Sequence, residues 1–257
     1  MDKITSKNNN LIKDTKKLFT SSKYRYEKGM LVLEGARLCF DVLNCICEVE
    51  YILFTEDMLK KYGDKISQLS HLSKFSFVIT PEISEKLSET KSPQGIFACV
   101  KMPPKRIDDL GKKIIVLDNV QDPSNVGAII RSAEALGIDT IITYQGCDIY
   151  NPKAIRSSMG GVLRMNICNV DDLCAELKAL KSKGYMIYST VPDNNAMKIT
   201  EIDFSLPSVC VIGNEANGVE DEIKAASDLL ITIPMLGRAE SLNASVAASI
   251  TMWEMLR

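Results

Sequence analysis

The sequence predicts an α/β protein of two domains, in which a smaller α/β domain precedes a larger one built on a doubly wound parallel sheet. Short β-branched runs alternate with segments of helical period along the chain, as strands and helices alternate in this fold class. In the second half these runs are apolar throughout, as expected for parallel strands buried on both faces. Between the halves, Pro103-Pro104 excludes both helix and central strand. We therefore expect domains at residues 1–102 and 113–257, joined by a linker at residues 103–112.

The first domain has the pattern of a small sandwich of strands and helices. Residues 1–28 are the most basic local segment, and their short amphipathic pattern fits either a solvated helix or an arm that contacts phosphates. Apolar runs and helical periods then alternate, and Pro81 stands at the first position of one helix. We predict strands at residues 31–33, 51–54, 75–79 and 96–100, and helices at residues 36–45, 56–69 and 81–87.

The second domain repeats a strand–helix unit several times. Its first strand is followed by a helix that Ser124 is expected to cap and Gly137 to end. A helix rich in small residues, expected to open at Ser241, closes the chain and can pack closely against another backbone. We predict strands at residues 114–117, 138–143, 163–167, 185–189, 209–212 and 229–233, and further helices at residues 152–159 and 171–183.

The composition disfavours several classes of site and of protein. Eight cysteines without a CxxC pair and a single histidine, His71, disfavour thiolate zinc sites, disulfide scaffolds and imidazole catalysis, and no metal is expected. A net charge of −2 gives no overall attraction to nucleic acid, so local patches must bind any polyanion. No apolar run approaches the roughly 18 residues of a membrane span, and no signal peptide is recognisable. The sequence thus predicts a cytoplasmic protein that does not bind membranes.

Polar residues gather in three loops of the second half. Segments 125–131, 213–218 and 233–243 each follow a predicted strand, and the carboxyl ends of parallel strands share one edge of a sheet. The absence of GxGxxG and GxxxxGK[ST] loops disfavours a nucleotide-dependent dehydrogenase or a triphosphate site. Taken alone, Arg131 fits a surface arginine and Glu215 a turn residue as well as functional roles. Their importance depends on whether the fold brings the loops together.

The same loops carry motifs that resemble those of a known family. They read Asn125-x-Gly127-Ala128-Ile129-x-Arg131, Gly213-Asn214-Glu215-x-x-Gly218 and Ile233-Pro234-Met235-x-Gly237-x-x-Glu240-Ser241-Leu242-Asn243-x-Ser245-x-Ala247. These segments resemble the three motifs of the SpoU (TrmH-like) RNA 2′-O-ribose methyltransferases of the SPOUT class. Leu33-Glu34-Gly35-x-Arg37 and Ser92-Pro93-Gln94-Gly95 are similar to the family's substrate-binding domain of ribosomal-protein L30e-like fold. The resemblance covers nearly the whole chain.

The resemblance implies S-adenosylmethionine-dependent methylation of a ribose 2′-hydroxyl in structured RNA by a homodimer. It also implies a deep trefoil knot in the C-terminal SPOUT domain, a feature that hydrophobic periodicity does not reveal. An L30e-like domain favours ribosomal RNA over transfer RNA as the substrate. The rival interpretation is a catalytically silent RNA-binding or ribosome-assembly protein of the same fold, and the intact motifs favour the enzyme.

Roles for individual residues follow from the same resemblance. The cofactor is expected to bind around Gly213, Glu215, Gly218, Ile233, Met235, Ser241 and Leu242. The expected catalytic group is Arg131, Asn125, Glu215, Ser241 and Asn243. In the family Arg131 is the proposed base, but a guanidinium stays charged at accessible pH, so orienting a phosphate and stabilising alkoxide charge is the alternative role. Candidate RNA contacts are Arg37 and Arg156, the latter within Asn151-Pro152-Lys153-x-x-Arg156.

Overall fold

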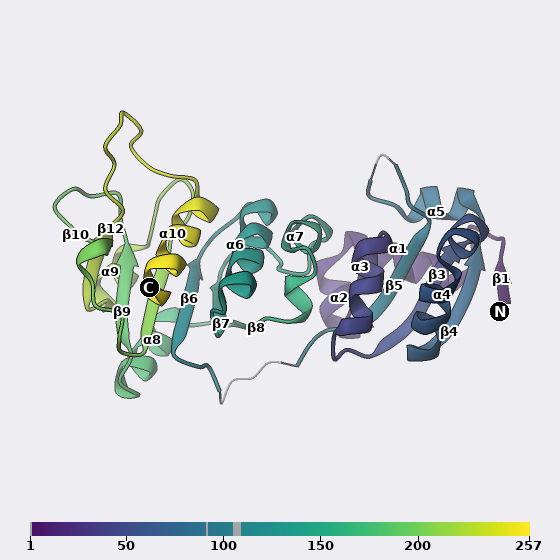
Figure 1. Cartoon of the computed structure of the whole chain (residues 1–257), viewed down its shortest axis with the longest axis horizontal. Helices are drawn as coiled ribbons and strands as arrows, with labels where there is room; N and C mark the ends of the chain where they lie inside the picture. The colour runs from purple at the N-terminus through teal and green to yellow at the C-terminus, as the bar shows by residue number, and fades with distance from the viewer. Residues whose placement is uncertain (1, 91, 105–108) are drawn as a thin grey trace. The chain divides into compact units, whose positions relative to one another are not determined.

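A computed structural model describes residues 2–90, 92–104 and 109–257, which form two compact units (Figure 1). The first unit combines Met1–Pro104 with Tyr150–Arg164, and the second combines Lys105–Ile149 with Met165–Arg257. The sequence pattern did not predict that a segment of the second half groups with the first unit. The expected linker at residues 103–112 lies partly outside the described residues, and the expected domain boundaries stay predictions.

The first unit is built on a five-stranded mixed sheet in the order β1-β4-β3-β5-β2. Strand β5 runs antiparallel to both β2 and β3, whereas β1, β3 and β4 are parallel to one another. The strands are β1 (Asp2–Ile4), β2 (Met30–Glu34), β3 (Val49–Thr55), β4 (Ser73–Ile79) and β5 (Ile96–Lys101). The helices are α1 (Asn10–Thr20), α2 (Ser22–Lys28), α3 (Ala36–Asp41), η1 (Val42–Asn44), α4 (Glu56–Leu72), α5 (Pro81–Leu87), α7 (Pro152–Ser158) and η2 (Gly161–Leu163).

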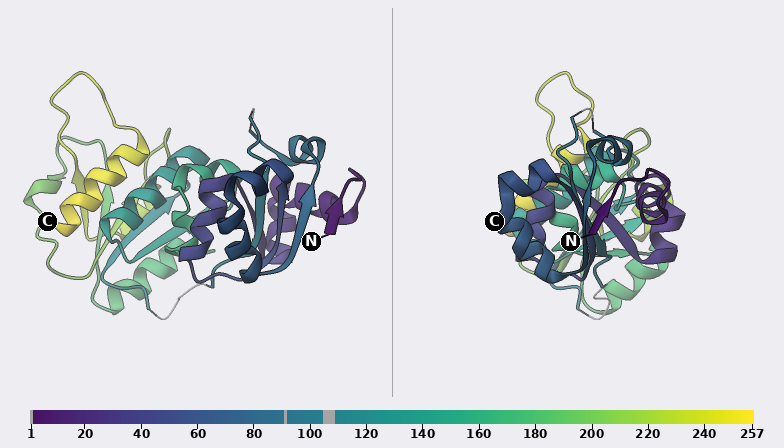
Figure 2. Two further views of the ribbon diagram at one scale, coloured as in Figure 1. Left: turned by 45° about the vertical axis from the view of Figure 1, so that its right-hand side comes forward. Right: turned by 90° about the vertical axis from the view of Figure 1, so that its right-hand side faces the viewer.

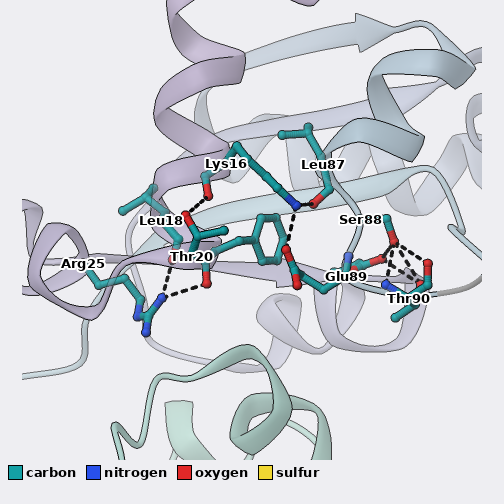
Figure 3. Close-up of polar contacts among 10 residues, drawn as sticks. Lys16, Leu18, Thr20, Arg25, Leu87, Ser88, Glu89 and Thr90 are labelled. Atoms are coloured by element: carbon teal, nitrogen blue, oxygen red, sulfur yellow. Dashed lines mark hydrogen bonds and ion pairs between the residues drawn. The ribbon is translucent and has the colours of Figure 1, made fainter.

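Polar contacts join α1 to α2 and to the segment after α5 in this unit (Figure 3). The buried Arg25 guanidinium donates to the carbonyl oxygens of Leu18 and Phe19 at 2.6 and 3.0 Å, so it satisfies carbonyl groups at the end of α1. Lys16 on α1 pairs with Glu89 at 2.6 Å, in the segment after α5. The basic amino-terminal segment is therefore ordered and contains β1 and α2, two elements that the sequence pattern did not predict.

The second unit is built on a seven-stranded sheet in the order β10-β12-β9-β11-β6-β7-β8, and all its strand pairs are parallel. Its strands are β6 (Lys113–Asp118), β7 (Thr140–Tyr144), β8 (Asn166–Asn169), β9 (Met186–Thr190), β10 (Met197–Lys198), β11 (Ser208–Ile212) and β12 (Leu229–Thr232). Its helices are α6 (Pro123–Leu136), α8 (Leu173–Ser182), η3 (Ile199–Glu201), α9 (Asp221–Ala226) and α10 (Ala244–Leu256). The predicted parallel α/β sheet is confirmed, with β10 as a short additional edge strand.

Helices cover both faces of this sheet (Figure 2). Ile114 and Val116 on β6 pack in one core with residues of α8 and α9. Because successive strand residues point to opposite faces, the buried Ile115 and Leu117 face the other side, where α6 and α10 pack against each other. The strands between them are buried on both faces, which explains their continuous apolar sequence. No helix among the described residues is both long and apolar enough to cross a bilayer.

Several predicted element boundaries differ from the structure by two or three residues, and three of the differences have a local cause. Helix α6 is capped by Asp122, whose side chain accepts from the Ser124 N–H, because Pro123 already occupies the first helical position. Helix α10 is capped by Asn243 and not by Ser241, since Asn243 Oδ1 accepts from the N–H groups of Ser245 and Val246. Strand β8 begins at Asn166, after the 3₁₀ turn η2, so the predicted strand start at residue 163 lies in a turn.

Candidate active site at the carboxyl edge of the parallel sheet

A cavity of about 450 Å³ opens where strands β9, β11 and β12 end. Its walls come from the three segments that follow these strands and from the first turn of α10. They are Thr190, Val191, Pro192, Ile212, Gly213, Asn214, Glu215, Ala216, Asn217, Gly218, Ile233, Met235, Ser241, Leu242, Asn243, Ala244 and Ala247. Of the three polar segments predicted to meet at the carboxyl edge of the sheet, 213–218 and 233–243 line this cavity, whereas 125–131 lies in α6 and contributes no residue to the lining.

The loop after β11 folds back tightly on itself. The N–H of Asn214 donates to the carbonyl of Gly218 at 2.9 Å, and the reverse bond is also 2.9 Å. A Cβ on Gly213 would lie 2.1 Å from the backbone carbon of Gly218 and 2.2 Å from the nitrogen of Val219. Gly218 itself has φ +70°, a conformation that favours glycine. Both glycines are therefore needed for the shape of this wall.

The side chain of Asn214 fixes the same loop from within. Its Oδ1 accepts from the N–H groups of Ala216 and Asn217 at 2.9 and 3.1 Å, which closes an Asx turn. Its Nδ2 donates to the carbonyl of Asn119 at 2.8 Å, at the end of β6. Sequence reasoning quoted Asn214 only as part of a motif, but the structure shows that it ties two strand ends together.

A chain of hydrogen bonds joins the three polar loops. The Glu215 carboxylate accepts from the N–H groups of Gln121 and Asp122, both at 3.1 Å, and from Asn125 Nδ2 at 2.9 Å. Asn125 Oδ1 in turn accepts from Asn243 Nδ2 at 3.0 Å. One residue from each loop thus takes part, and α6, the loop after β11 and the start of α10 are held in register.

The electrostatics of Glu215 agree with this arrangement. Partial burial alone would raise the pKa of Glu215, but the hydrogen bonds from Asn125, Gln121 and Asp122 outweigh it and hold the pKa below its ordinary value. Glu215 is therefore an ionised acceptor at neutral pH, and both of its oxygens are engaged. A carboxylate in this state is a poor proton acceptor.

A second carboxylate lies beneath the same loop and was not singled out from the sequence. Asp118, at the end of β6, is fully buried, and its Oδ2 accepts from the N–H of Glu220 at 2.9 Å. Burial raises the pKa of Asp118, although the bond from Glu220 acts in the opposite direction. Its place at the carboxyl end of a predicted strand was the available signal.

Two family models together match most of the chain. Residues 112–253 match the model described as the SpoU rRNA Methylase family, and residues 9–98 match the MRM3-like substrate binding domain. The first match covers more than half of the chain. The chain belongs to the SpoU rRNA methylase family. The family predicted from the three motifs is confirmed, and so is the predicted class of parallel-sheet fold with a smaller α/β domain before it.

Relatives of this SpoU family member align along almost its full length. The 23S rRNA (guanosine(2553)-2′-O)-methyltransferase RlmP of Bacillus subtilis is 31% identical over 256 residues, which cover 99% of each chain. The SpoU methyltransferase AviRb from Streptomyces viridochromogenes, solved in complex with AdoMet, is 25% identical with a TM-score of 0.84 and 97% of each chain covered. A putative RNA methyltransferase of the TrmH family from Porphyromonas gingivalis is 27% identical, with a TM-score of 0.84, 96% of this chain covered and 97% of its own.

The SpoU motif residues divide into three groups in the structure. All of the predicted cofactor-binding residues line the cavity, together with Asn243. Asn125 is buried and reaches the cavity wall through Glu215 and Asn243. Arg131 is exposed on α6, outside the cavity lining, and its guanidinium makes no hydrogen bond or ion pair with the described residues.

The remaining predicted contacts and some missed ones lie elsewhere. Arg37 and Arg156 belong to the first unit, and neither guanidinium has a hydrogen bond or ion pair to the described part of the chain. The last residue of β9 and the two residues after it, 190–192, line the cavity although no motif marked them. Their position at the end of a parallel strand was the signal that could have identified them. The described residues contain no group of three or more His, Cys, Asp or Glu side chains that could hold a metal ion.

Proposed function

We propose that this chain transfers a methyl group from S-adenosylmethionine to a ribose 2′-hydroxyl of ribosomal RNA. The observation that carries the proposal is the cavity itself, around which Glu215, Asn125 and Asn243 join all three SpoU motifs by hydrogen bonds. Ribosomal RNA is favoured over transfer RNA because RlmP, a 23S rRNA methyltransferase by name, aligns over almost the entire chain. A ribosomal RNA substrate also supports a cytoplasmic location, which we propose with it.

The cavity fits the cofactor in size and in chemistry. A volume of about 450 Å³ lies within the range of small-molecule sites. Apolar side chains of Ile212, Ile233 and Leu242 line it beside the backbone of residues 213–218, which suits a ligand with both an adenine ring and a polar amino-acid part. The bound cofactor supplies a methyl group activated by attachment to a positively charged sulfur. Aligning that group with the hydroxyl is the main task of the walls.

Glu215, Asn125 and Asn243 act in this proposal as positioning residues. Their polar side-chain atoms are used in bonds to one another and to backbone groups, so they hold the loops and not the reacting atoms. Ser241 differs, because it lines the cavity and has no hydrogen bond to any residue that the structure describes. Its hydroxyl is available for a contact with cofactor or ribose.

Arg131 supplies a positive charge for the substrate phosphate and for the reacting oxygen. The proton of the 2′-hydroxyl leaves ahead of C–O bond formation, so the oxygen carries negative charge as it attacks the methyl carbon, and the electron pair of the broken C–S bond stays on the sulfur. The Arg131 guanidinium is exposed and without a polar partner in the described chain, so it can contact a phosphate of the substrate. Because it stays protonated, we assign it to orienting that phosphate and stabilising the developing charge, and the proton leaves to water.

We also propose that the protein forms a homodimer through α10. Val246, Trp253 and Leu256 are 46%, 61% and 41% exposed, and their spacing places them near one face of the helix. An exposed apolar stripe of this kind is typical of a subunit interface. We also propose that the C-terminal domain contains the deep trefoil knot that the family resemblance implies.

Transfer of labelled methyl groups tests the proposed function. The protein is incubated with S-adenosylmethionine labelled in its methyl group and with either ribosomal RNA or transfer RNA from cells that lack the gene. We expect label in ribosomal RNA, at an alkali-resistant ribose linkage. If the protein binds cofactor and ribosomal RNA but transfers no label, the catalytically silent alternative is correct. Label in transfer RNA alone would overturn the assignment of the substrate.

A further inference from the structure

The first unit contains a cleft of about 500 Å³ whose lining is unlike that of the methyltransferase cavity. Helix α3, the turn η1 and helix α4 provide most of its lining, and the loop before β5 adds Gln94. Arg37, Lys65, Phe40 and Tyr62 bring positive charge and aromatic rings to this lining. Nothing in the proposed chemistry of the second unit accounts for such a combination.

The aromatic part of the cleft is built by an irregular point in α4. Tyr62 has φ −133° and ψ 34°, values outside the helical region, so α4 is kinked at this residue. Its ring packs edge-on against Phe40, with the ring centroids 5.4 Å apart and the planes at 61°. Phe40 is buried, but Tyr62 is only partly covered. One aromatic ring therefore remains accessible in the cleft and is held in place by another.

The cations around these rings are not neutralised. Lys65 lies over the Phe40 ring at 5.4 Å and Lys61 over the Tyr62 ring at 5.2 Å, and both ammonium groups are without an ion pair in the described chain. Arg37 is likewise exposed, and its guanidinium is without a hydrogen bond or ion pair to described residues. The acidic side chain in the lining, Asp41, is bound by the Arg164 guanidinium. The cleft therefore presents net positive charge.

The loop that supplies Gln94 is fixed by a buried carboxylate. Glu34 accepts from the Ser88 hydroxyl, from the Thr90 hydroxyl at 3.0 Å and from the N–H of Glu89 at 3.2 Å, a cluster whose segment Figure 3 shows. The same loop then brings Gln94 Oε1 to the N–H of Ala36 at 2.8 Å. Of the motif Glu34-Gly35-x-Arg37, the first residue holds residues 88–90, and the Arg37 guanidinium, which lines the cleft, has no polar partner among the residues that the structure describes.

We propose that this cleft binds one unpaired nucleotide of the RNA substrate and the phosphates beside it. The base contacts the Tyr62 ring and the amide of Gln94, and the phosphates pair with Arg37 and Lys65. Proteins recognise single-stranded RNA with this combination of an accessible aromatic ring and unpaired cations. An acidic peptide would use the cations but not the ring. The inference rests on the proposed function, since it assigns how the RNA substrate is held.

Direct binding to the full chain tests the inference without relying on methyl transfer. The probe is a fluorescently labelled oligouridine, and its dissociation constant is measured by anisotropy between about 50 and 200 mM salt. We compare Arg37→Ala/Lys65→Ala with the control Lys60→Ala/Lys74→Ala. The control lysines are 77% and 50% exposed and lie outside the cleft lining, and Lys60 is on the same helix as Lys65.

The cleft pair and the control pair should behave differently. Removing two phosphate contacts should weaken binding about tenfold and reduce the slope of log affinity against log salt by about 1.4, because each contact to a single strand contributes about 0.7. The control pair should change affinity less than about twofold. Equal effects of the two double variants would overturn the inference, because nonspecific charge would then explain the binding.

The aromatic contact has its own matched pair of variants. Tyr62→Ala should weaken oligouridine binding about tenfold with little change in salt slope, and Tyr62→Phe, which keeps the ring and its packing, should bind within about twofold of the unchanged protein. Unfolding of the first unit in Tyr62→Ala is separated from loss of the contact by circular dichroism and thermal unfolding, in which the variant should keep the spectrum and the transitions of the unchanged protein. If Tyr62→Ala binds normally and polyaspartate competes with the RNA, the cleft is an acidic-peptide site and the inference is wrong.

The two proposals fail in distinguishable ways. RNA binding that depends on the cleft, with no label transferred to any RNA, contradicts the proposed function and leaves the cleft assignment intact. Label transfer with an unchanged KM for ribosomal RNA in Arg37→Ala/Lys65→Ala contradicts the cleft assignment and leaves the proposed function intact.

Discussion

The close approach of backbone atoms to Gly213 allows a quantitative prediction of the affinity for the cofactor. In Gly213→Ala the new methyl group would lie 2.1 and 2.2 Å from backbone atoms, whereas carbon atoms pack at about 3.5–4.0 Å. The loop must open by more than about 1 Å, so the two 2.9 Å bonds between Asn214 and Gly218 are lost or weakened. At about 0.5–1.5 kcal/mol each, the cost is about 1–3 kcal/mol.

Calorimetry with S-adenosylmethionine measures this cost. If cofactor binding must restore the native loop, about 1–3 kcal/mol corresponds to a dissociation constant about 5- to 150-fold larger. Gly237→Ala is the control, because that position lies in the third motif and an added Cβ would meet no atom within 4 Å. Its affinity should stay within about twofold. Unchanged affinity and unchanged thermal stability in Gly213→Ala would refute the role of this close approach.

Three further predictions concern chemistry, acid stability and assembly. Arg131→Ala should lower the rate of methyl transfer by at least about 100-fold, while cofactor affinity by calorimetry changes less than about twofold, and loss of cofactor binding would instead make Arg131 structural. The pKa of Glu215 is depressed in the folded state, so its stabilising effect is present above its ordinary pKa of about 4.3 and is lost as pH falls through the lower folded value. Urea unfolding of Glu215→Gln should therefore show less loss of stability on acidification than the unchanged protein, and equal losses would contradict the hydrogen-bond account. Trp253→Asp should convert a dimer into a monomer in light scattering, and a monomeric unchanged protein would contradict the proposed interface.

Much of the second unit could be predicted from periodicity and strand ends. The central strands β6, β7 and β11 are largely apolar because both faces of the sheet are covered there, and that pattern is local in sequence. The meeting of the polar loops followed from parallel strand direction alone. The family resemblance then selected Glu215 and Asn125 among many polar residues.

The parts that could not be predicted depend on contacts between distant residues. Helix α10 is capped by Asn243 and not by Ser241. The Asn243 side chain also donates to Asn125, which lies 118 positions earlier in the sequence. The grouping of Tyr150–Arg164 with the first unit depends on contacts such as the ion pair between Arg164 and Asp41. Spacing within a sequence carries no information about such partners.

If this SpoU family member methylates ribose in ribosomal RNA, a 2′-O-methylated nucleoside of that RNA must depend on the gene. Ribosomal RNA is isolated from cells with and without the gene, digested to nucleosides and analysed by mass spectrometry for 2′-O-methylated nucleosides. We predict one methylated nucleoside at lower abundance without the gene, restored when the purified protein and S-adenosylmethionine are added to the deficient RNA. Identical nucleoside profiles, with no methylation gained on adding the protein, would contradict the account.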